Sequence, residues 1–142
     1  MKKIIDEIKV RLASNNCWCA EVARSVVTAF LAPQNYSLEE LADIRCSVGE
    51  AVANCIMHAY KEPSDKNYIY ITARVYDNGE FSIEISDNGC GFDTSIFARN
   101  EKGFGFMVMQ NFMDSVSVKS KIGKGTTVLM RKKMTKESED TE

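Results

Sequence analysis

One stretch of the sequence places a carboxylate, an amide and an imidazole at intervals of four residues. Glu50, Asn54 and His58 would share one face of a helix, because residues four apart lie above one another on its surface. A carboxylate can take a proton from an attacking hydroxyl, and an amide oxygen can bind a hard cation such as Mg²⁺. The same triplet is also compatible with an ordinary solvated helix face, so the spacing alone leaves both interpretations open.

A second group of candidate residues follows a predicted strand, in the segment Asp87-Asn88-Gly89-Cys90-Gly91. In many proteins such a segment is only a turn. Alternatively, the Asp87 carboxylate can accept a hydrogen bond from the exocyclic amine of a purine, while Gly89 and Gly91 let the backbone lie against the flat base. The segment therefore allows a nucleobase site.

Two further glycine segments would complete a nucleotide site. Gly103-Phe104-Gly105 opens a predicted helix whose exposed N–H groups can bind phosphate, with Lys102 and Arg99 nearby to add charge. Gly125-Thr126-Thr127 is either a plain glycine turn or a source of hydroxyls that reach a base through water. The sequence has neither the dinucleotide-binding glycine fingerprint nor the GxxxxGK[ST] phosphate loop, so the two common nucleotide folds are not supported.

The hydrophobic pattern predicts the elements that must position these residues. Residues 8–12 alternate between apolar and polar side chains, which indicates a half-buried strand. Apolar residues at helical spacing predict a first helix over 18–31, and Pro33 follows its end. Ser37-Leu38-Glu39-Glu40 has the form of a capping box, so a second helix should begin there and continue to Tyr60, carrying Glu50 and Asn54.

The second half of the chain predicts two hairpins separated by a helix. Residues 68–75 and 81–86 flank the turn Asp77-Asn78-Gly79, a third helix begins after Gly103, and a last hairpin turns at 123–125. This order favours an α+β fold: a two-layer sandwich with the helices on one face of a mainly antiparallel mixed sheet. We expect a single domain over residues 1–134, followed by a charged, disordered tail over 135–142.

Composition excludes several classes of function. The 142 residues suffice for one domain, and 18 Lys and Arg against 20 Asp and Glu lack the basic excess of a protein that binds nucleic acid directly. No apolar run approaches the roughly 20 residues needed to span a membrane, so we expect a cytoplasmic location. Five cysteines without a CxxC pair indicate reduced thiols, and a single histidine disfavours zinc sites and histidine-based nucleophilic catalysis.

The four candidate segments, taken in order, resemble the nucleotide-binding boxes of the GHKL ATPase superfamily. The resemblance lies in residues 50–60, 87–91, 103–106 and 125–127, and it extends over nearly the whole domain. Within the superfamily the chain is similar to the bacterial anti-sigma factor serine kinases. The stretch from Gly105 to Val128 is particularly similar to the anti-sigma F group of sporulating bacteria.

The resemblance implies a role for each candidate residue and a set of partners. Glu50 would be the general base, Asn54 the Mg²⁺ ligand, and Asp87 the residue that recognises the adenine of ATP. Thr127 would assist at the base, and the glycines around the nucleotide would be Gly89, Gly91, Gly103 and Gly105. A homodimer of this kind captures a sigma factor, here expected to be sporulation sigma F, and phosphorylates a serine of a STAS-domain anti-anti-sigma protein. Relatives carry an arginine at the position of Arg24 on a partner-binding face, although Arg24 is equally compatible with an ordinary surface charge.

The sequence departs from this family pattern between the two glycine boxes. Only eleven residues, Phe92 to Lys102, lie where relatives usually have a longer ATP lid. A shorter lid has fewer groups with which to exclude water from phosphoryl transfer. The alternative hypothesis is therefore a nucleotide-gated sigma-binding module with little or no kinase activity. A smaller departure is Gly49, which precedes Glu50 where relatives often have serine.

Overall fold

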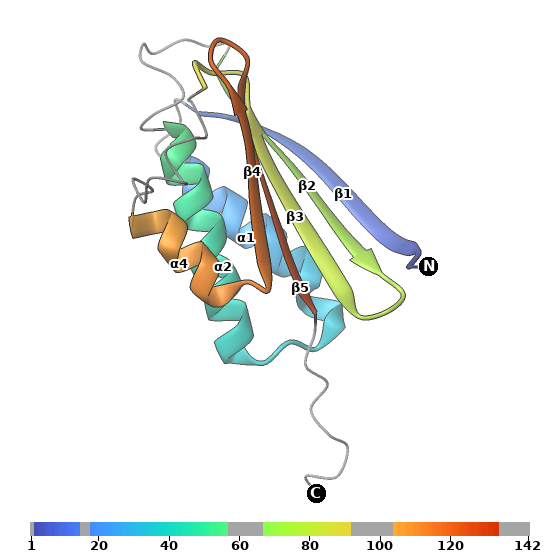
Figure 1. The fold of residues 1–142 in the computed structure, drawn as a ribbon. Helices are drawn as coiled ribbons and strands as arrows, with labels where there is room; N and C mark the ends of the chain where they lie inside the picture. The colour runs from blue at the N-terminus through green and yellow to red at the C-terminus, as the bar shows by residue number, and fades with distance from the viewer. Residues whose placement is uncertain (1, 15–17, 57–66, 92–103, 134–142) are drawn as a thin grey trace, which may run out of the picture.

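The protein was analysed as a computed structural model that describes residues 2–14, 18–56, 67–91 and 104–133. Within these ranges the chain forms five strands, three α-helices and one short 3-10 helix (Figure 1). In chain order they are β1 (Ile4–Ala13), α1 (Cys19–Leu31), η1 (Ala32–Gln34), α2 (Leu38–Asn54), β2 (Tyr68–Tyr76), β3 (Glu80–Asp87), α4 (Phe104–Phe112), β4 (Ser115–Lys121) and β5 (Gly125–Lys133).

The strands form one twisted sheet in the order β1-β2-β3-β5-β4. All four neighbouring pairs are antiparallel, and no parallel pair occurs among the strands that the structure describes. The helices lie together on one face of this sheet, with α2 between α1 and α4 (Figure 1). The predicted α+β two-layer sandwich is therefore confirmed.

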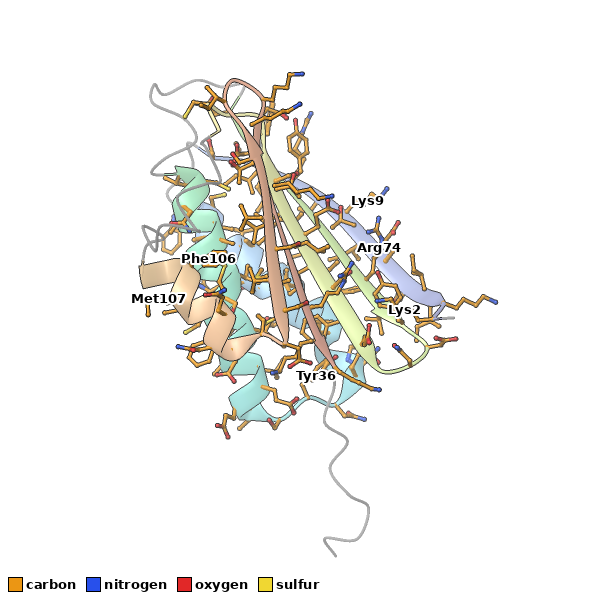
Figure 2. All side chains as sticks on the ribbon, viewed as in Figure 1. Lys2, Lys9, Tyr36, Arg74, Phe106 and Met107 are labelled. Atoms are coloured by element: carbon orange, nitrogen blue, oxygen red, sulfur yellow. The ribbon has the colours of Figure 1, made fainter. Side chains whose placement is uncertain are left out.

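Alternation along the strands separates a buried face of the sheet from an open one. On β3, Phe81, Ile83 and Ile85 are fully buried beneath the helices. The intervening residues face the opposite side, where Lys9 and Arg74 lie, whereas Phe106 and Met107 belong to α4 on the helical side (Figure 2). The same alternation decides which strand-end residues face the helices and can take part in a site between the two layers.

Helix α2 begins at the predicted capping box. The Ser37 hydroxyl accepts a hydrogen bond from the Glu40 backbone N–H at 3.0 Å, and the Glu40 carboxylate accepts one from the Ser37 N–H at 3.2 Å. These bonds satisfy backbone donors that the first turn of a helix leaves unpaired. The buried side chains of Ile44, Val48 and Val52 then hold the helix against the core, so that α2 carries Glu50 and Asn54 at fixed positions.

Several predicted features lie outside the described residues. They are His58 and the end of the second helix, the segment Phe92 to Lys102, Gly103, and the tail over 135–142. Among the helices that the structure describes, none combines the length and the apolar character needed to cross a membrane.

Candidate functional site

Asp87 is the last residue of β3. It lies almost fully buried between the sheet and the helices, with 5% of the residue exposed. Its Oδ1 atom accepts hydrogen bonds from the backbone N–H groups of Gly89 at 2.9 Å and Thr126 at 3.2 Å. One carboxylate oxygen thus ties the loop after β3 to the start of β5.

Two glycines allow these segments to approach so closely. Gly125 has a φ of +97°, and a Cβ at this position would collide with the backbone carbonyl of Asp87. Gly91 has a φ of +65°, and a Cβ there would collide with the backbone carbonyl of Lys121. Both positions require glycine for conformational and steric reasons. The Gly123 N–H also donates to the Cys90 carbonyl at 2.6 Å, so the loop after β3 is held against the β4–β5 turn.

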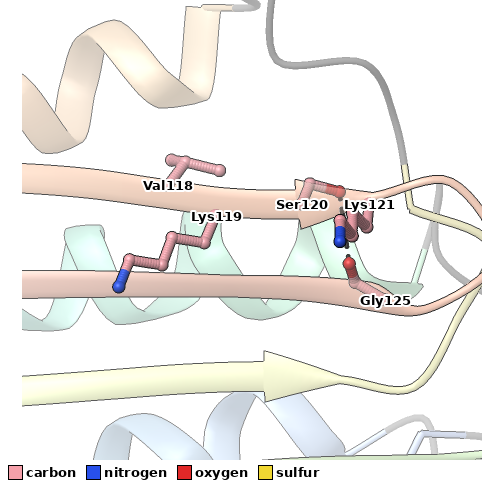
Figure 3. Close-up of a pocket in the computed structure, with 5 residues that line it drawn as sticks. All are labelled: Val118, Lys119, Ser120, Lys121 and Gly125. Carbon is pink, nitrogen blue, oxygen red and sulfur yellow. Dashed lines mark hydrogen bonds between the residues drawn. The ribbon is translucent and has the colours of Figure 1, made fainter.

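An open cavity of about 440 Å³ lies beside this junction. Its lining comes from the end of β4 and the start of β5: Val118, Lys119, Ser120, Lys121 and Gly125 (Figure 3). The Ser120 hydroxyl donates to the Gly125 carbonyl at 3.3 Å, as Figure 3 shows. Ser120 faces the helical side, whereas Lys119 and Lys121 alternate with it on the strand.

Glu50 and Asn54 lie one helical turn apart on α2, and both are half-buried. The carboxylate of Glu50 rests against the first turn of α4, where a Cβ at Gly105 would collide with Oε2. The structure therefore places Gly105 as the residue that makes room for Glu50 beside α4. The N-terminal end of a helix also favours a nearby negative charge.

The register of β5 places the two neighbouring threonines on opposite faces of the sheet. Thr127 pairs with Ser86 and alternates with the buried Val128, so it lies on the open face of the sheet, away from Asp87. Thr126 lies on the helical face, and its hydroxyl shares a 2.7 Å hydrogen bond with the Ser120 hydroxyl. Thr126 is thus the threonine beside Asp87, whereas the family resemblance had assigned the role at the base to Thr127. The alternation of Val128 and Met130 along β5 was the signal that could have identified it.

Arg24 lies on α1 and crosses toward α2. Its guanidinium donates from Nη2 and Nε to the Glu21 carboxylate at 2.9 Å and 3.2 Å, and Arg45 of α2 donates to the same carboxylate at 2.9 Å. The two arginines, Arg24 first, lower the pKa of Glu21 below its usual value. A Cβ at Gly49 would stand 2.6 Å from the Arg24 Nη1 atom, so Gly49 provides the space that this guanidinium occupies.

The site thus gathers Asp87, Gly89, Gly91, Gly125 and Thr126 at one junction, and Glu50, Asn54 and Gly105 at another. Glu50 and Asn54 belong to α2, and at the end of that helix burial, and then the charge of Asp87, raise the pKa of the Cys55 thiol. Among the described residues, no group of three or more histidine, cysteine or acidic side chains is placed to hold a metal ion.

Comparisons with known proteins agree on the type of domain. A family model described as a histidine kinase-like ATPase domain matches residues 1–132. An anti-sigma F factor from Caldanaerobacter subterraneus subsp. tengcongensis is 42% identical over 120 residues, which cover 78% of this chain and 82% of that protein. An anti-sigma F factor from Clostridium perfringens is 40% identical over 122 residues, which cover 79% of this chain and 86% of that protein.

Solved structures share the fold at lower identity. The crystal structure of the RsbU and RsbW domains of a Mycobacterium tuberculosis protein matches with a TM-score of 0.71 and 19% identity, over 91% of this chain and 32% of that chain. A chain of the SiaB–SiaC complex from Pseudomonas aeruginosa matches with a TM-score of 0.59 and 11% identity, over 91% of this chain and 89% of that chain. At these identities the two structures bear on the fold alone.

Proposed function

Because the chain belongs to the histidine kinase-like ATPase family, alongside the anti-sigma F factors, we propose that it is an ATP-dependent protein serine kinase that also sequesters a sigma factor. The observation that carries this proposal is the placement of a carboxylate at each end of one helix-lined site. Asp87 is buried and fixed by backbone donors, as a residue that recognises a base must be. Glu50 is half-buried, as a residue that receives a proton from a protein substrate must be.

Each residue then has one task in the transfer. Asp87 accepts a hydrogen bond from the adenine amine of ATP, and the hydroxyl pair of Ser120 and Thr126 lies on the same face to bind water at the base. Glu50 takes the proton of the attacking serine hydroxyl while the serine oxygen forms a bond to the γ-phosphorus. The bond from that phosphorus to the bridging oxygen breaks, and ADP leaves with the electron pair.

The donor set of the site fits a magnesium ion that is shared with phosphate oxygens. The Asn54 amide oxygen is a hard, uncharged ligand one helical turn from Glu50, and it would hold the ion on the phosphate side of the site. When bound, Mg²⁺ would neutralise the charge that develops on the phosphates. The carboxylate of Glu50 stays on the α4 side, against Gly105, where it is available for the serine proton.

The proposed partners follow from the relatives. Two proteins named anti-sigma F factors are at least 40% identical to this chain over more than three quarters of its length, which supports sporulation sigma F as the captured protein. We further propose that the serine substrate belongs to a STAS-domain anti-anti-sigma protein and that the kinase acts as a homodimer. Arg24 and its bridging partners on α1 and α2 would form part of the partner-binding face.

Transfer of labelled phosphate tests the kinase proposal. The full chain is incubated with Mg²⁺, γ-labelled ATP and a STAS-domain protein from the same organism, and label on a partner serine is followed over time. The proposal expects label to accumulate on one serine and to depend on Mg²⁺. A partner that stays unlabelled, although the chain binds ATP, would contradict it.

The eleven residues between the glycine boxes favour a second candidate, a nucleotide-gated sigma-binding module. A short lid excludes less water and so supports binding better than phosphoryl transfer. This candidate expects sigma factor to co-purify with the chain only when nucleotide is present, with little label on the STAS partner. Rapid turnover on the partner serine would eliminate it.

Substitution of Thr126 and Thr127, one at a time, should show on which face of β5 the base binds. We expect Thr126→Val to weaken Mg·ADP binding about fivefold, because it removes one hydroxyl beside Asp87. Thr127→Val, its matched control on the open face, should leave the dissociation constant within about twofold. Isothermal titration calorimetry measures both values. A larger effect at Thr127 than at Thr126 would mean that the base does not bind on the helical face.

Gly49→Ser should alter the partner-binding face because it displaces the side chain of Arg24. The added side chain would push aside the Arg24 guanidinium, which is the mobile end of a long side chain, so the free energy of unfolding should change by less than about 1 kcal/mol. Capture of the sigma factor should weaken as much as it does in Arg24→Ala, because both changes remove the guanidinium from its place beside Glu21. Binding is measured by surface plasmon resonance and stability by urea unfolding. Full binding by Gly49→Ser together with weak binding by Arg24→Ala would show that Gly49 does not set the position of Arg24.

A further inference from the structure

Helix α1 has apolar side chains on two sides. One side packs into the core through Cys19, Ala23, Val27 and Leu31. On the other side Trp18, the residue just before the helix, is 67% exposed, and Val22 is 38% exposed. The Val22 N–H donates to the Trp18 carbonyl at 2.9 Å, so the two residues lie one turn apart at the start of α1. The only tryptophan of the sequence is therefore in contact with water in the free chain.

The exposed side of α1 has few of the charged residues that usually face water. Of the 13 residues of the helix, only Glu21 and Arg24 are charged. The next exposed residues, Ser25 and Ala29, are small and uncharged. A surface helix ordinarily carries charged and polar side chains opposite its buried stripe, whereas apolar side chains on both sides are typical of a helix that is covered. We therefore expect another molecule to cover this side of α1.

The charged residues beside Trp18 and Val22 indicate the chemistry of that molecule. Arg24 and Arg45 both donate to the Glu21 carboxylate, each at 2.9 Å. Two positive charges against one negative charge leave one net positive charge, directly before Val22 in the sequence. The three side chains are between 31% and 44% exposed, so they remain accessible to a partner. A complementary surface would have an apolar side chain next to a carboxylate.

We propose that Trp18 and Val22 form the apolar centre of the face that binds the sigma factor, and that the sigma factor contributes an apolar side chain flanked by a carboxylate. This inference rests on the proposed function, in which Arg24 belongs to the partner-binding face. Tryptophan is among the residue types that most often dominate the energy of an interface, whereas exposed ion pairs contribute little by themselves. The largest loss of binding should therefore follow from removal of the indole ring.

The single tryptophan makes this contact directly observable. The full chain is labelled with 5-fluorotryptophan, so that Trp18 gives its one fluorine resonance. Unlabelled sigma F from the same organism is added with Mg²⁺ and a non-hydrolysable ATP analogue. The resonance should shift, and its response to replacement of H₂O by D₂O should decrease because the indole ring leaves water. An unchanged resonance at saturating sigma factor would overturn the inference.

Substitutions measure how much each side chain contributes, with surface plasmon resonance for binding. Trp18→Ala should weaken capture of the sigma factor about 30-fold and Val22→Ala about fivefold. Trp18→Phe keeps a large aromatic ring and should lose less than about threefold. Met107→Ala is the matched control, because Met107 is 48% exposed on α4, which α2 separates from α1 (Figure 1); it should stay within about twofold. The midpoints of thermal unfolding should stay within about 2 °C, since the replaced side chains are exposed.

The remaining outcomes decide against the inference in distinguishable ways. If Trp18→Ala captures the sigma factor as the original chain does, or if Met107→Ala loses as much, the inference is overturned. The proposed function then stands, provided that Arg24→Ala still weakens capture. If Trp18→Ala loses binding to the STAS protein but not to the sigma factor, this side of α1 serves the other partner and the inference is again overturned. If the original chain captures no sigma factor, both the inference and the proposed sequestration are wrong.

Discussion

Replacement of Asp87 by asparagine is expected to weaken Mg·ADP binding about 100-fold while the protein stays folded. The amide oxygen of asparagine can still accept the N–H groups of Gly89 and Thr126, so the junction between the β3 loop and β5 is preserved. The amide nitrogen then takes the place of Oδ2 and points a donor at the adenine amine, itself a donor. A buried pair of donors without an acceptor is strongly unfavourable.

Calorimetry gives the affinity, and circular dichroism with thermal unfolding checks the fold. Asp77→Asn is the matched control, because this residue lies in the exposed turn between β2 and β3, at the other end of the hairpin. It should bind ADP as the original chain does. Undiminished ADP affinity in a folded Asp87→Asn variant would mean that this carboxylate does not receive the base.

Replacement of Glu50 by glutamine is expected to slow phosphoryl transfer to the partner serine about 100- to 1,000-fold, within the range typical for loss of a general base. Glutamine has nearly the same shape and still fits against Gly105, so ADP binding should remain within about twofold. The amide cannot accept the serine proton. The loss should therefore appear in the rate of transfer and not in nucleotide affinity.

Initial rates with γ-labelled ATP measure this effect, and Glu39→Gln provides the control. Glu39 is an exposed carboxylate in the first turn of the same helix and should be replaceable without loss of rate. If Glu50→Gln transferred phosphate at the original rate, Glu50 would not be the base. An equal loss of rate in Glu39→Gln would point to a general effect of charge on the helix.

Most of the fold could be predicted because its signals are local. The capping box at Ser37 starts α2 at the predicted residue, and the Asp77-Asn78-Gly79 turn joins β2 to β3 as expected. Alternating apolar residues on β1, β3 and β5 likewise mark the strands that the structure contains. Each of these signals involves residues within a few positions of one another, where the backbone period and side-chain chemistry act directly.

The site was less predictable because its contacts join residues that are distant in the sequence. The contact between Thr126 and Asp87 depends on the register of β5 against β3, which shifts every side chain to the opposite face when it moves by one residue. The space that Gly49 leaves for Arg24 depends on how α1 packs against α2. The approach of Gly105 to Glu50 depends on how α4 packs against α2, and nothing in the local sequence of either helix indicates it.

The central claim is that one site on the helical face of the sheet binds ATP between Asp87 and Glu50. A crystal structure of the chain with Mg²⁺ and a non-hydrolysable ATP analogue tests it most directly. We predict the adenine amine on the Asp87 carboxylate, the metal ion on the Asn54 amide oxygen, and the terminal phosphate on the side of Glu50. A nucleotide bound elsewhere on the protein, or an empty site at saturating analogue, would contradict the claim.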